Sequence, residues 1–161
     1  MKTVIVYYSL EGNTHYIAEK IAEKLGADTL RLRTKKAYAD KGFAKFFWGG
    51  KSAVMAEKPE LEPFDTDIAS YDRIIIGFPV WASNITPPIR SFISECAADL
   101  KGKKIAVFAC ESGSGAPKAF EKLKKALGSA DYEAEAVFID PKDRPSEKNS
   151  EVLDDFCGRL V

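Results

Sequence analysis

The chain has 161 residues, of which 45% are apolar and 30% are charged, and its 24 basic and 24 acidic side chains cancel to a formal net charge of zero. A chain of this length most simply forms one domain with a buried core, so we expect a single domain over residues 1–161. The balanced charge disfavours nucleic-acid binding, which calls for an excess of basic side chains. No apolar run reaches the roughly 20 residues of a membrane span, and the run near the N-terminus is too short for a signal peptide.

Cysteine and histidine usage excludes several kinds of site. The cysteines Cys96, Cys110 and Cys157 are odd in number and far apart, which fits neither a disulfide framework nor a CxxC metal pattern. We therefore interpret them as reduced thiols and expect a cytoplasmic protein with no metal site. The one histidine, His15, has no evident acid–base partner, and we interpret it as a surface residue of a helix.

Strand and helix patterns alternate along the first half of the chain. Residues 3–8 (TVIVYY) are β-branched and aromatic, as in a buried strand. Residues 14–25 carry apolar side chains at helical spacing, and Gly26 ends this helix. The alternating TLRLR at 29–33 predicts a half-exposed strand near a sheet edge, and the apolar RIIIGF at 73–78 predicts a buried third strand.

The second half of the chain continues this alternation. Pro87 and Pro88 suit the first turn of a helix that extends to Cys96. The patterns then predict, in chain order, a strand over 104–110 (KIAVFAC), a helix over 116–127, a strand over 134–139 (AEAVFI) and an amphipathic helix over 150–160. Five strands that alternate with helices indicate an α/β fold, a three-layer sandwich with a five-stranded parallel sheet and helices on both faces.

One segment, residues 34–66, breaks the alternation between the second and third strands. It is too long for a simple turn, and its position calls for a crossover helix. We treat it as an insertion and expect helical pieces that are interrupted at Gly49 and Gly50.

Three loops of unusual composition follow predicted strands. Ligands of open parallel sheets bind outside the carboxyl ends of the strands, where residues 9–14, 78–86 and 110–116 would meet. In the first loop, SLEGNT, backbone N–H groups at a helix N-terminus could hold an anion and Gly12 would let the chain wrap round it. The loop has no Lys or Arg and lacks the GxxxxGK pattern of phosphoryl transfer. It therefore predicts a phosphate that is held and left unreacted, with an ordinary helix N-cap as the alternative.

The other two loops are suited to a flat ligand. Trp81 in the second loop offers either core packing or a stacking surface for a ring system. In the third loop, ESGSGAP, Gly113 and Gly115 would let the backbone approach a ligand closely, although a flexible linker is the alternative reading. Together the three loops predict a planar heterocycle that carries a phosphate.

The first strand, turn and helix carry a motif that resembles the signature of the flavodoxin family. The motif begins with an apolar strand end that closes on an aromatic residue, which is Ile5, Val6 and Tyr7 here. It continues with a hydroxyl residue, a small residue and Thr in the turn, and with Ala and an aliphatic residue in the helix. These positions are met by Ser9, Gly12, Thr14, Ala18 and Ile21. The order of strands and helices resembles that family over nearly the whole chain and looks like its short type. The resemblance implies a flavodoxin-like fold and non-covalently bound FMN.

The resemblance also implies which residues contact FMN. The first loop would grip the 5′-phosphate, the second would line the isoalloxazine ring with Trp81 stacked on or near it, and the third would meet the pyrimidine edge. The implied binding residues are Ser9, Leu10, Glu11, Gly12, Asn13, Thr14, Pro79, Val80, Trp81, Ala82, Ser83, Asn84, Cys110, Glu111, Ser112, Gly113, Ser114 and Gly115. No side chain is expected to be catalytic, because the flavin supplies the redox chemistry.

Three departures from the family bear on the role. The chain is neutral where typical flavodoxins are acidic, the ring loop PVWASN lacks the usual Gly, and ESGSGAP lacks a second stacking aromatic. The insertion has aromatic residues at Phe43, Phe46, Phe47 and Trp48, and residues 35–58 hold six lysines and two acids. A helix's core face is the first interpretation of these aromatics; as a hypothesis, the segment covers the flavin or docks a partner.

We expect an electron carrier that exchanges electrons with redox partner proteins or with a small-molecule donor or acceptor. The departures favour a second candidate, an FMN-dependent NAD(P)H or quinone oxidoreductase. A third is a flavin-binding module without turnover. The fold alone does not separate these roles, because function depends on the site.

Overall fold

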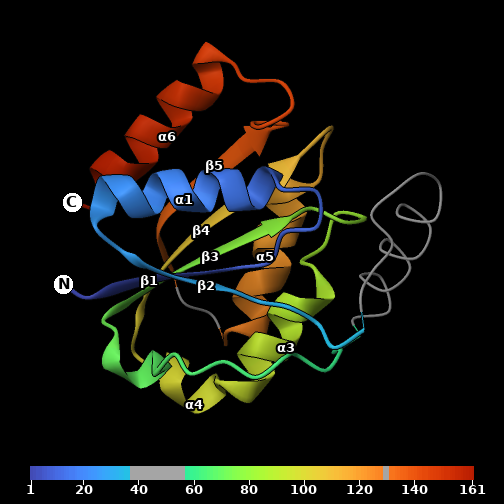
Figure 1. Cartoon of the computed structure of the whole chain (residues 1–161), viewed down its shortest axis with the longest axis vertical. Helices are drawn as coiled ribbons and strands as arrows, with labels where there is room; N and C mark the ends of the chain where they lie inside the picture. The colour runs from blue at the N-terminus through green and yellow to red at the C-terminus, as the bar shows by residue number, and fades with distance from the viewer. Residues whose placement is uncertain (37–56, 129–130) are drawn as a thin grey trace.

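The computed structural model describes residues 1–36, 57–128 and 131–161. Its centre is one five-stranded sheet in the order β2-β1-β3-β4-β5, in which all neighbouring strands are parallel (Figure 1). The strands are β1 (Thr3–Tyr7), β2 (Asp28–Arg31), β3 (Arg73–Pro79), β4 (Lys104–Glu111) and β5 (Tyr132–Ile139). The predicted five-stranded parallel α/β fold is therefore confirmed.

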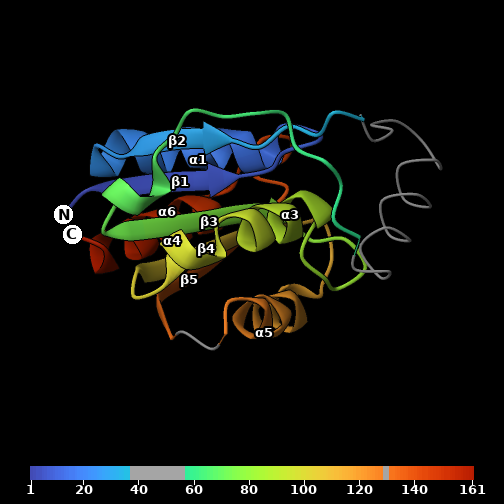
Figure 2. The same ribbon diagram turned by 90° about the horizontal axis from the view of Figure 1, so that it is seen from below.

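Helices cover both faces of this sheet and make three layers. The helices α1 (Asn13–Leu25) and α6 (Glu147–Arg159) pack on one face. The other face carries the helices α3 (Pro87–Glu95), α4 (Ala97–Leu100) and α5 (Ala116–Ala126), and the 3₁₀ turn η1 (Ile68–Ser70). In Figure 1, α1 and α6 lie on one side of the sheet and α3 and α4 on the other, and Figure 2 looks onto the side of α3 and α4. Both chain termini lie at the end of the sheet opposite to the loops that follow β1, β3 and β4 (Figure 1).

The burial of each strand explains its sequence pattern. The three central strands β1, β3 and β4 are covered on both faces, so nearly every residue in them is buried and apolar. The edge strand β5 alternates between buried and exposed positions along most of its length. Burying one large aliphatic side chain contributes about 1.5–3 kcal/mol, so the Ile74–Ile76 run of β3, fully buried on both faces, is a major part of the core.

The predicted boundaries differ from the structure mainly near the C-terminus. The strand β5 begins at Tyr132, two residues before the predicted start, and the Tyr132 hydroxyl donates to the Phe120 carbonyl over 2.7 Å. The helix α6 begins at Glu147 instead of residue 150, because the Ser146 hydroxyl accepts a hydrogen bond from the Asn149 N–H and caps its first turn. The other predicted helices and strands agree with the structure to within about two residues, whereas the short helix α4 and the 3₁₀ turn η1 were not predicted.

The insertion at 34–66 lies largely outside the described residues, and so do Gly49, Gly50 and the four aromatic residues from Phe43 to Trp48. Its two described ends lie side by side: Thr34 and Leu61 form an antiparallel bridge, and Lys35 pairs with Glu60 at 2.6 Å. None of the described helices is long and apolar enough to cross a membrane.

We predict that Gly77→Ala destabilises the fold. Gly77 in β3 is paired with Phe108 in β4, and a Cβ on Gly77 would lie 2.2 Å from the Phe108 ring. That ring is fully buried between Phe138 and Phe156, so it cannot move aside without disturbing the core. Overpacking of this kind costs about 1–3 kcal/mol, which urea unfolding would measure.

The matched control for this prediction is Gly158→Ala. Gly158 lies in α6 with nothing within 4 Å of the added Cβ, so its unfolding free energy should stay the same or rise by up to about 1 kcal/mol. Equal stability of the Gly77→Ala and Gly158→Ala variants would contradict the close packing of Phe108 on β3.

Candidate functional site

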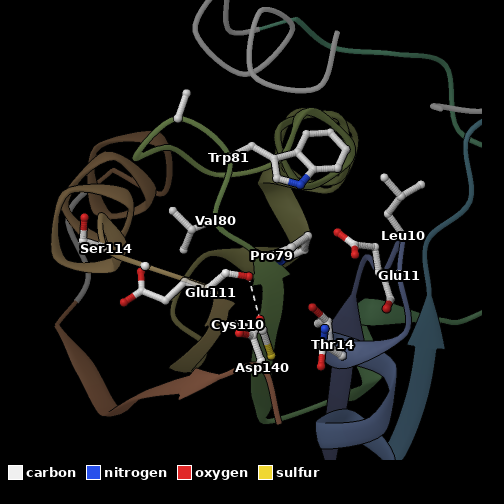
Figure 3. Close-up of a pocket in the computed structure, with 15 residues that line it drawn as sticks. Leu10, Glu11, Thr14, Pro79, Val80, Trp81, Cys110, Glu111, Ser114 and Asp140 are labelled. Atoms are coloured by element: carbon white, nitrogen blue, oxygen red, sulfur yellow. Dashed lines mark hydrogen bonds between the residues drawn. The ribbon is translucent and has the colours of Figure 1, made fainter. Parts of the chain in front are cut away.

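A cavity of about 290 Å³ opens at the carboxyl ends of β1, β3 and β4 (Figure 3). The sheet order reverses direction between β1 and β3, which is where ligands of open α/β sheets bind. The cavity is lined by Ser9, Leu10, Glu11, Asn13, Thr14, Pro79, Val80, Trp81, Ala82, Cys110, Glu111, Ser112, Gly113, Ser114 and Asp140. The three loops chosen from the sequence therefore meet at one place.

The first loop leads into the N-terminus of α1. Gly12 has φ +102°, a left-handed conformation that glycine adopts without strain, and it turns the chain into the helix. The Ser9 hydroxyl accepts a hydrogen bond from the His15 N–H at 3.1 Å, so it satisfies one of the free amides there. The first turn of α1 contains no acidic residue. The remaining N–H groups leave a positive end of the helix dipole at the cavity.

Thr14 places a buried hydroxyl at this helix end. The residue is 1% exposed, and apart from an interaction with the neighbouring Cys110 thiol its Oγ1 atom has no hydrogen-bond partner among the described residues. A buried hydroxyl without a full partner costs about 1–3 kcal/mol. Such a group in a cavity wall is typical of a site that is completed by a ligand.

The second loop closes on itself as a tight turn. Trp81 and Asn84 exchange both backbone hydrogen bonds, at 3.3 and 3.0 Å. The two residues between them, Ala82 and Ser83, have φ of +51° and +56°, as in a type I′ turn. Neither is a glycine, so each stores about 1–2 kcal/mol of backbone strain.

The side chains of this turn point in different directions. Trp81 is half-buried at the cavity (Figure 3). Its ring meets the Tyr8 ring edge-on, with ring centroids 5.8 Å apart. Asn84 is buried away from the cavity, and its Oδ1 accepts hydrogen bonds from the Ile85 N–H and the Arg90 guanidinium, both at 2.9 Å. Trp81 therefore faces the cavity, while Asn84 holds the turn in place.

The third loop contacts the second through Gly115. A Cβ on Gly115 would lie 2.6 Å from Ser83 Oγ and 2.9 Å from Ser83 Cα, and Gly115 has φ +112°. The Lys122 ammonium of α5 donates to the Ser83 carbonyl at 3.3 Å. Glu111, at the end of β4, accepts a hydrogen bond from the Ala116 N–H at 3.0 Å and so caps α5. The close approach of the second and third loops thus requires glycine at 115, and the Lys122 hydrogen bond adds a second contact to Ser83.

Sequence reasoning missed Asp140, which lines the cavity from the end of β5. Its Oδ1 accepts a hydrogen bond from the Ser112 hydroxyl at 2.6 Å, and its own N–H donates to the Glu111 carbonyl at 3.1 Å. Its Oδ2 lies 3.1 Å from the Arg144 guanidinium without a well-directed hydrogen bond. The sequence held one signal for Asp140, its position directly after the predicted strand that ends at Ile139. In a parallel sheet the end of that strand lies at the same edge as the three loops.

The cysteines are free and buried in the described structure. Burial raises the pKa of Cys110, which lines the cavity, to about 12 and that of Cys96 to about 11. The Cys157 pKa is also raised by burial. All three groups are therefore neutral thiols at pH 7, and Cys110 contributes shape to the cavity and no nucleophile.

His15 lies in α1 and is half-buried, and the expectation that it has no hydrogen-bond partner is wrong. Its Nδ1 lies 2.6 Å from the hydroxyl of Tyr7, and the two rings stack with centroids 5.8 Å apart. Burial raises the pKa of Tyr7, which keeps the phenol protonated at neutral pH. This pair lies under the first loop and supports it, and neither residue lines the cavity.

The predicted site residues divide into two groups. Fourteen of the predicted eighteen line the cavity, whereas Gly12, Ser83, Asn84 and Gly115 do not. Gly12 and Gly115 shape the loops, and Ser83 and Asn84 belong to the turn after β3, in which Ser83 is strained and Asn84 holds the turn in place. Among the described residues no group of three or more His, Cys, Asp or Glu could hold a metal ion.

Comparison with known protein families shows to which family this fold belongs. The family model described as flavodoxin matches residues 2–147. The chain belongs to the flavodoxin family. Solved structures of similar shape include a Lactobacillus acidophilus flavoprotein in complex with FMN, with 21% identity over 84% of this chain and 92% of that one and a TM-score of 0.74. A Bacteroides eggerthii putative flavoprotein has 23% identity over 98% of both chains and a TM-score of 0.72.

The flavodoxin of Megasphaera elsdenii is also similar, with 21% identity over 99% of both chains and a TM-score of 0.61. At these identities the structures support the fold that the family model indicates. The sheet order β2-β1-β3-β4-β5 is the order of flavodoxins.

We predict that Gly115→Ala destabilises this flavodoxin. The added Cβ would press on Ser83, and alanine is strained at a φ of +112°. The expected loss is about 1–3 kcal/mol of unfolding free energy in urea. Gly113→Ala in the same loop is the control, since nothing lies within 4 Å of its added Cβ and its stability should change by less than about 0.5 kcal/mol. Equal losses in both variants would refute the proposed contact between the loops.

Proposed function

We propose that this flavodoxin binds FMN non-covalently in the cavity and acts as an electron carrier between redox partners. The observation that supports this most strongly is the buried Thr14 hydroxyl, which lies without a full partner at the open N-terminus of α1. A phosphate would supply the acceptor that this hydroxyl lacks. The related Lactobacillus acidophilus flavoprotein was solved in complex with FMN, which supports the same cofactor here.

The residues of the first loop fit the phosphate end of FMN. The helix N-terminus attracts a negatively charged group, and the left-handed Gly12 gives the backbone room to curve round it. Ser9 and Thr14 provide hydroxyls, and Asn13 lines the same wall of the cavity. A phosphate monoester needs no cationic side chain in this loop, because backbone N–H groups already supply hydrogen bonds and partial positive charge.

The other loops fit the remainder of the ligand. Trp81 offers a flat surface for the isoalloxazine ring, and residues 111–114, which line the cavity, would meet a ring edge. Asp140 adds carboxylate oxygens that could accept hydrogen bonds from the ribityl hydroxyls between ring and phosphate. When bound, FMN supplies the one- or two-electron chemistry, and the protein orients it and sets its potential.

The acidic groups of the cavity would affect that potential. Glu11, Glu111 and Asp140 line it, while residues 77–86 contribute no acid. A negative charge near a bound ring opposes the addition of negative charge by reduction. These carboxylates therefore favour the oxidised ligand, as in the acidic members of the family, even though the whole chain is neutral.

One observation favours a second candidate, an FMN-dependent NAD(P)H or quinone oxidoreductase. Trp81 is the one aromatic side chain among the described residues that line the cavity. If Trp81 covers one face of a bound ring, no aromatic side chain of the described lining residues covers the other face, so a small substrate could reach that face. A third candidate, a flavin-binding module without turnover, has no observation of its own.

We predict that Thr14→Val weakens FMN binding at least about tenfold, because a hydrogen bond to a charged group contributes about 1.5–3 kcal/mol. The same change removes a buried hydroxyl without a full partner, so the ligand-free protein should be equally or more stable. Fluorescence quenching of FMN on titration with ligand-free protein measures the affinity, and urea unfolding measures the stability.

Thr86→Val is the matched control. The Thr86 hydroxyl is also fully buried without a partner among the described residues, but Thr86 does not line the cavity. FMN affinity should therefore stay at the wild-type value in this variant. Equal FMN affinity in Thr14→Val and wild type would contradict the proposed phosphate site.

Anaerobic reduction of the FMN-loaded protein is predicted to separate the candidate roles. A carrier should pass through two spectrally distinct one-electron stages during a dithionite titration, with an absorbance band that rises at partial reduction and then disappears. An oxidoreductase should bleach in one stage and consume NAD(P)H in the presence of a quinone. Bleaching in one stage would overturn the carrier assignment, and the absence of NAD(P)H consumption would then leave the module as the remaining role.

A further inference from the structure

A lysine that follows β5 lies against the first loop. The Lys142 side chain packs on Gly12, such that a Cβ on Gly12 would lie 3.0 Å from Lys142 Nζ and 3.4 Å from its Cδ. The Lys142 N–H also donates to Asn13 Oδ1 at 2.9 Å, and Asn13 Nδ2 donates to Asp143 Oδ2 at 3.2 Å. The Asn13 side chain thus ties the segment after β5 to the turn, and this contact directs the Lys142 ammonium towards the start of α1.

The place of this ammonium is unfavourable in the protein alone. It lies at the positive end of the α1 dipole, where a cation is repelled and an anion is attracted. No carboxylate of the described residues forms an ion pair with the Lys142 ammonium. Glu19 and Glu23 line the same surface groove along α1 as Lys142, but they lie too far from its ammonium for an ion pair. The first turn of α1 has no acid to compensate either. An anion held in the turn would turn this repulsion into attraction.

A second observation points to an anion at the same place. Thr14, 1% exposed, has a hydroxyl that lacks a full partner and lies at the cavity wall beside this helix end. Lys142 approaches from the outer side of the turn, through Gly12, and does not line the cavity itself. Its effect on a ligand in the cavity would therefore be electrostatic across the backbone of the turn.

We propose that Lys142 is a specificity-determining residue that makes the first loop select a phosphorylated ligand over its unphosphorylated form. The proposal rests on the proposed FMN site, whose phosphate would lie in this loop. The loop itself has no cation. The Arg31 guanidinium donates to the Ser9 carbonyl at 3.2 Å, and Lys142, about 130 positions after the loop, would add the countercharge at Gly12. The direct hydrogen bonds come from the loop, and Lys142 adds charge that matches a dianion.

The test compares FMN with riboflavin, which lacks the phosphate, in Lys142→Gln and in Lys148→Gln. Lys148 is an exposed lysine in α6 that lies away from Gly12, so its removal changes the net charge equally. Lys142→Gln should raise the FMN dissociation constant roughly five- to tenfold at low salt, with no change for riboflavin. The difference should shrink at roughly 0.5 M salt, because exposed charges are screened. Lys148→Gln should match wild type with both ligands.

Two outcomes would overturn the role of Lys142. Equal FMN affinity in Lys142→Gln and Lys148→Gln would mean that the ammonium contributes no countercharge. An equal loss of FMN and riboflavin affinity would mean that Lys142 only holds the loop in shape.

Inorganic phosphate tests the same residue without any flavin. Phosphate should raise the melting temperature of the ligand-free wild-type and Lys148→Gln proteins more than that of Lys142→Gln. Should the wild type bind neither flavin while the phosphate effect still depends on Lys142, the FMN proposal fails and the role of Lys142 stands. An equal phosphate effect in all three proteins overturns the role of Lys142.

Discussion

The site depends on one constraint, the parallel direction of every strand in a sheet whose order reverses between β1 and β3. Because the strands are parallel, the loops after β1, β3, β4 and β5 all leave the same edge. The reversal separates α1 from α3, since their crossovers run to opposite faces, and so it opens the cavity between the first two loops. No single loop forms the cavity, and each contributes one wall of it.

The phosphate site proposed in the first loop would hold an anion with little charge of its own. The groups that would bind the anion are the free N–H groups at the start of α1 and the hydroxyls of Ser9 and Thr14, and the left-handed Gly12 shapes the turn around them. The cost is borne by the ligand-free protein, which keeps a buried hydroxyl without a full partner and a lysine at the positive end of a helix. Both costs would disappear if an anion occupied the turn, so they would favour the ligand-bound form of the proposed site.

The sequence was sufficient for the five strands, for the helices α1, α3, α5 and α6 and for the three loops, because local patterns determine them; the short α4 and η1 were not predicted. Continuous apolar runs belong to strands buried on both faces, and Gly and Pro mark their ends. Asp140 and Lys142 were missed because they act on residues more than 25 and more than 125 positions away, through contacts with Ser112 and Asn13. No local pattern encodes such distant pairs. The left-handed pair Ala82 and Ser83 was also beyond reach, since neither residue type prefers that conformation.

The strained turn after β3 bears on how the site can respond to a change of ligand charge. Ala82 and Ser83 already occupy the left-handed region, and Ser83 is held by Gly115 and by the Lys122 ammonium. A backbone that is fixed from two sides has little freedom to rotate one of its peptides. We therefore expect the ring loop to keep its conformation, and the adjustment to a new charge to come from side chains and solvent at the cavity. If FMN binds in this cavity as proposed, a ring loop that keeps its conformation would leave the nearby carboxylates of Glu11, Glu111 and Asp140 to adjust the potential of the flavin.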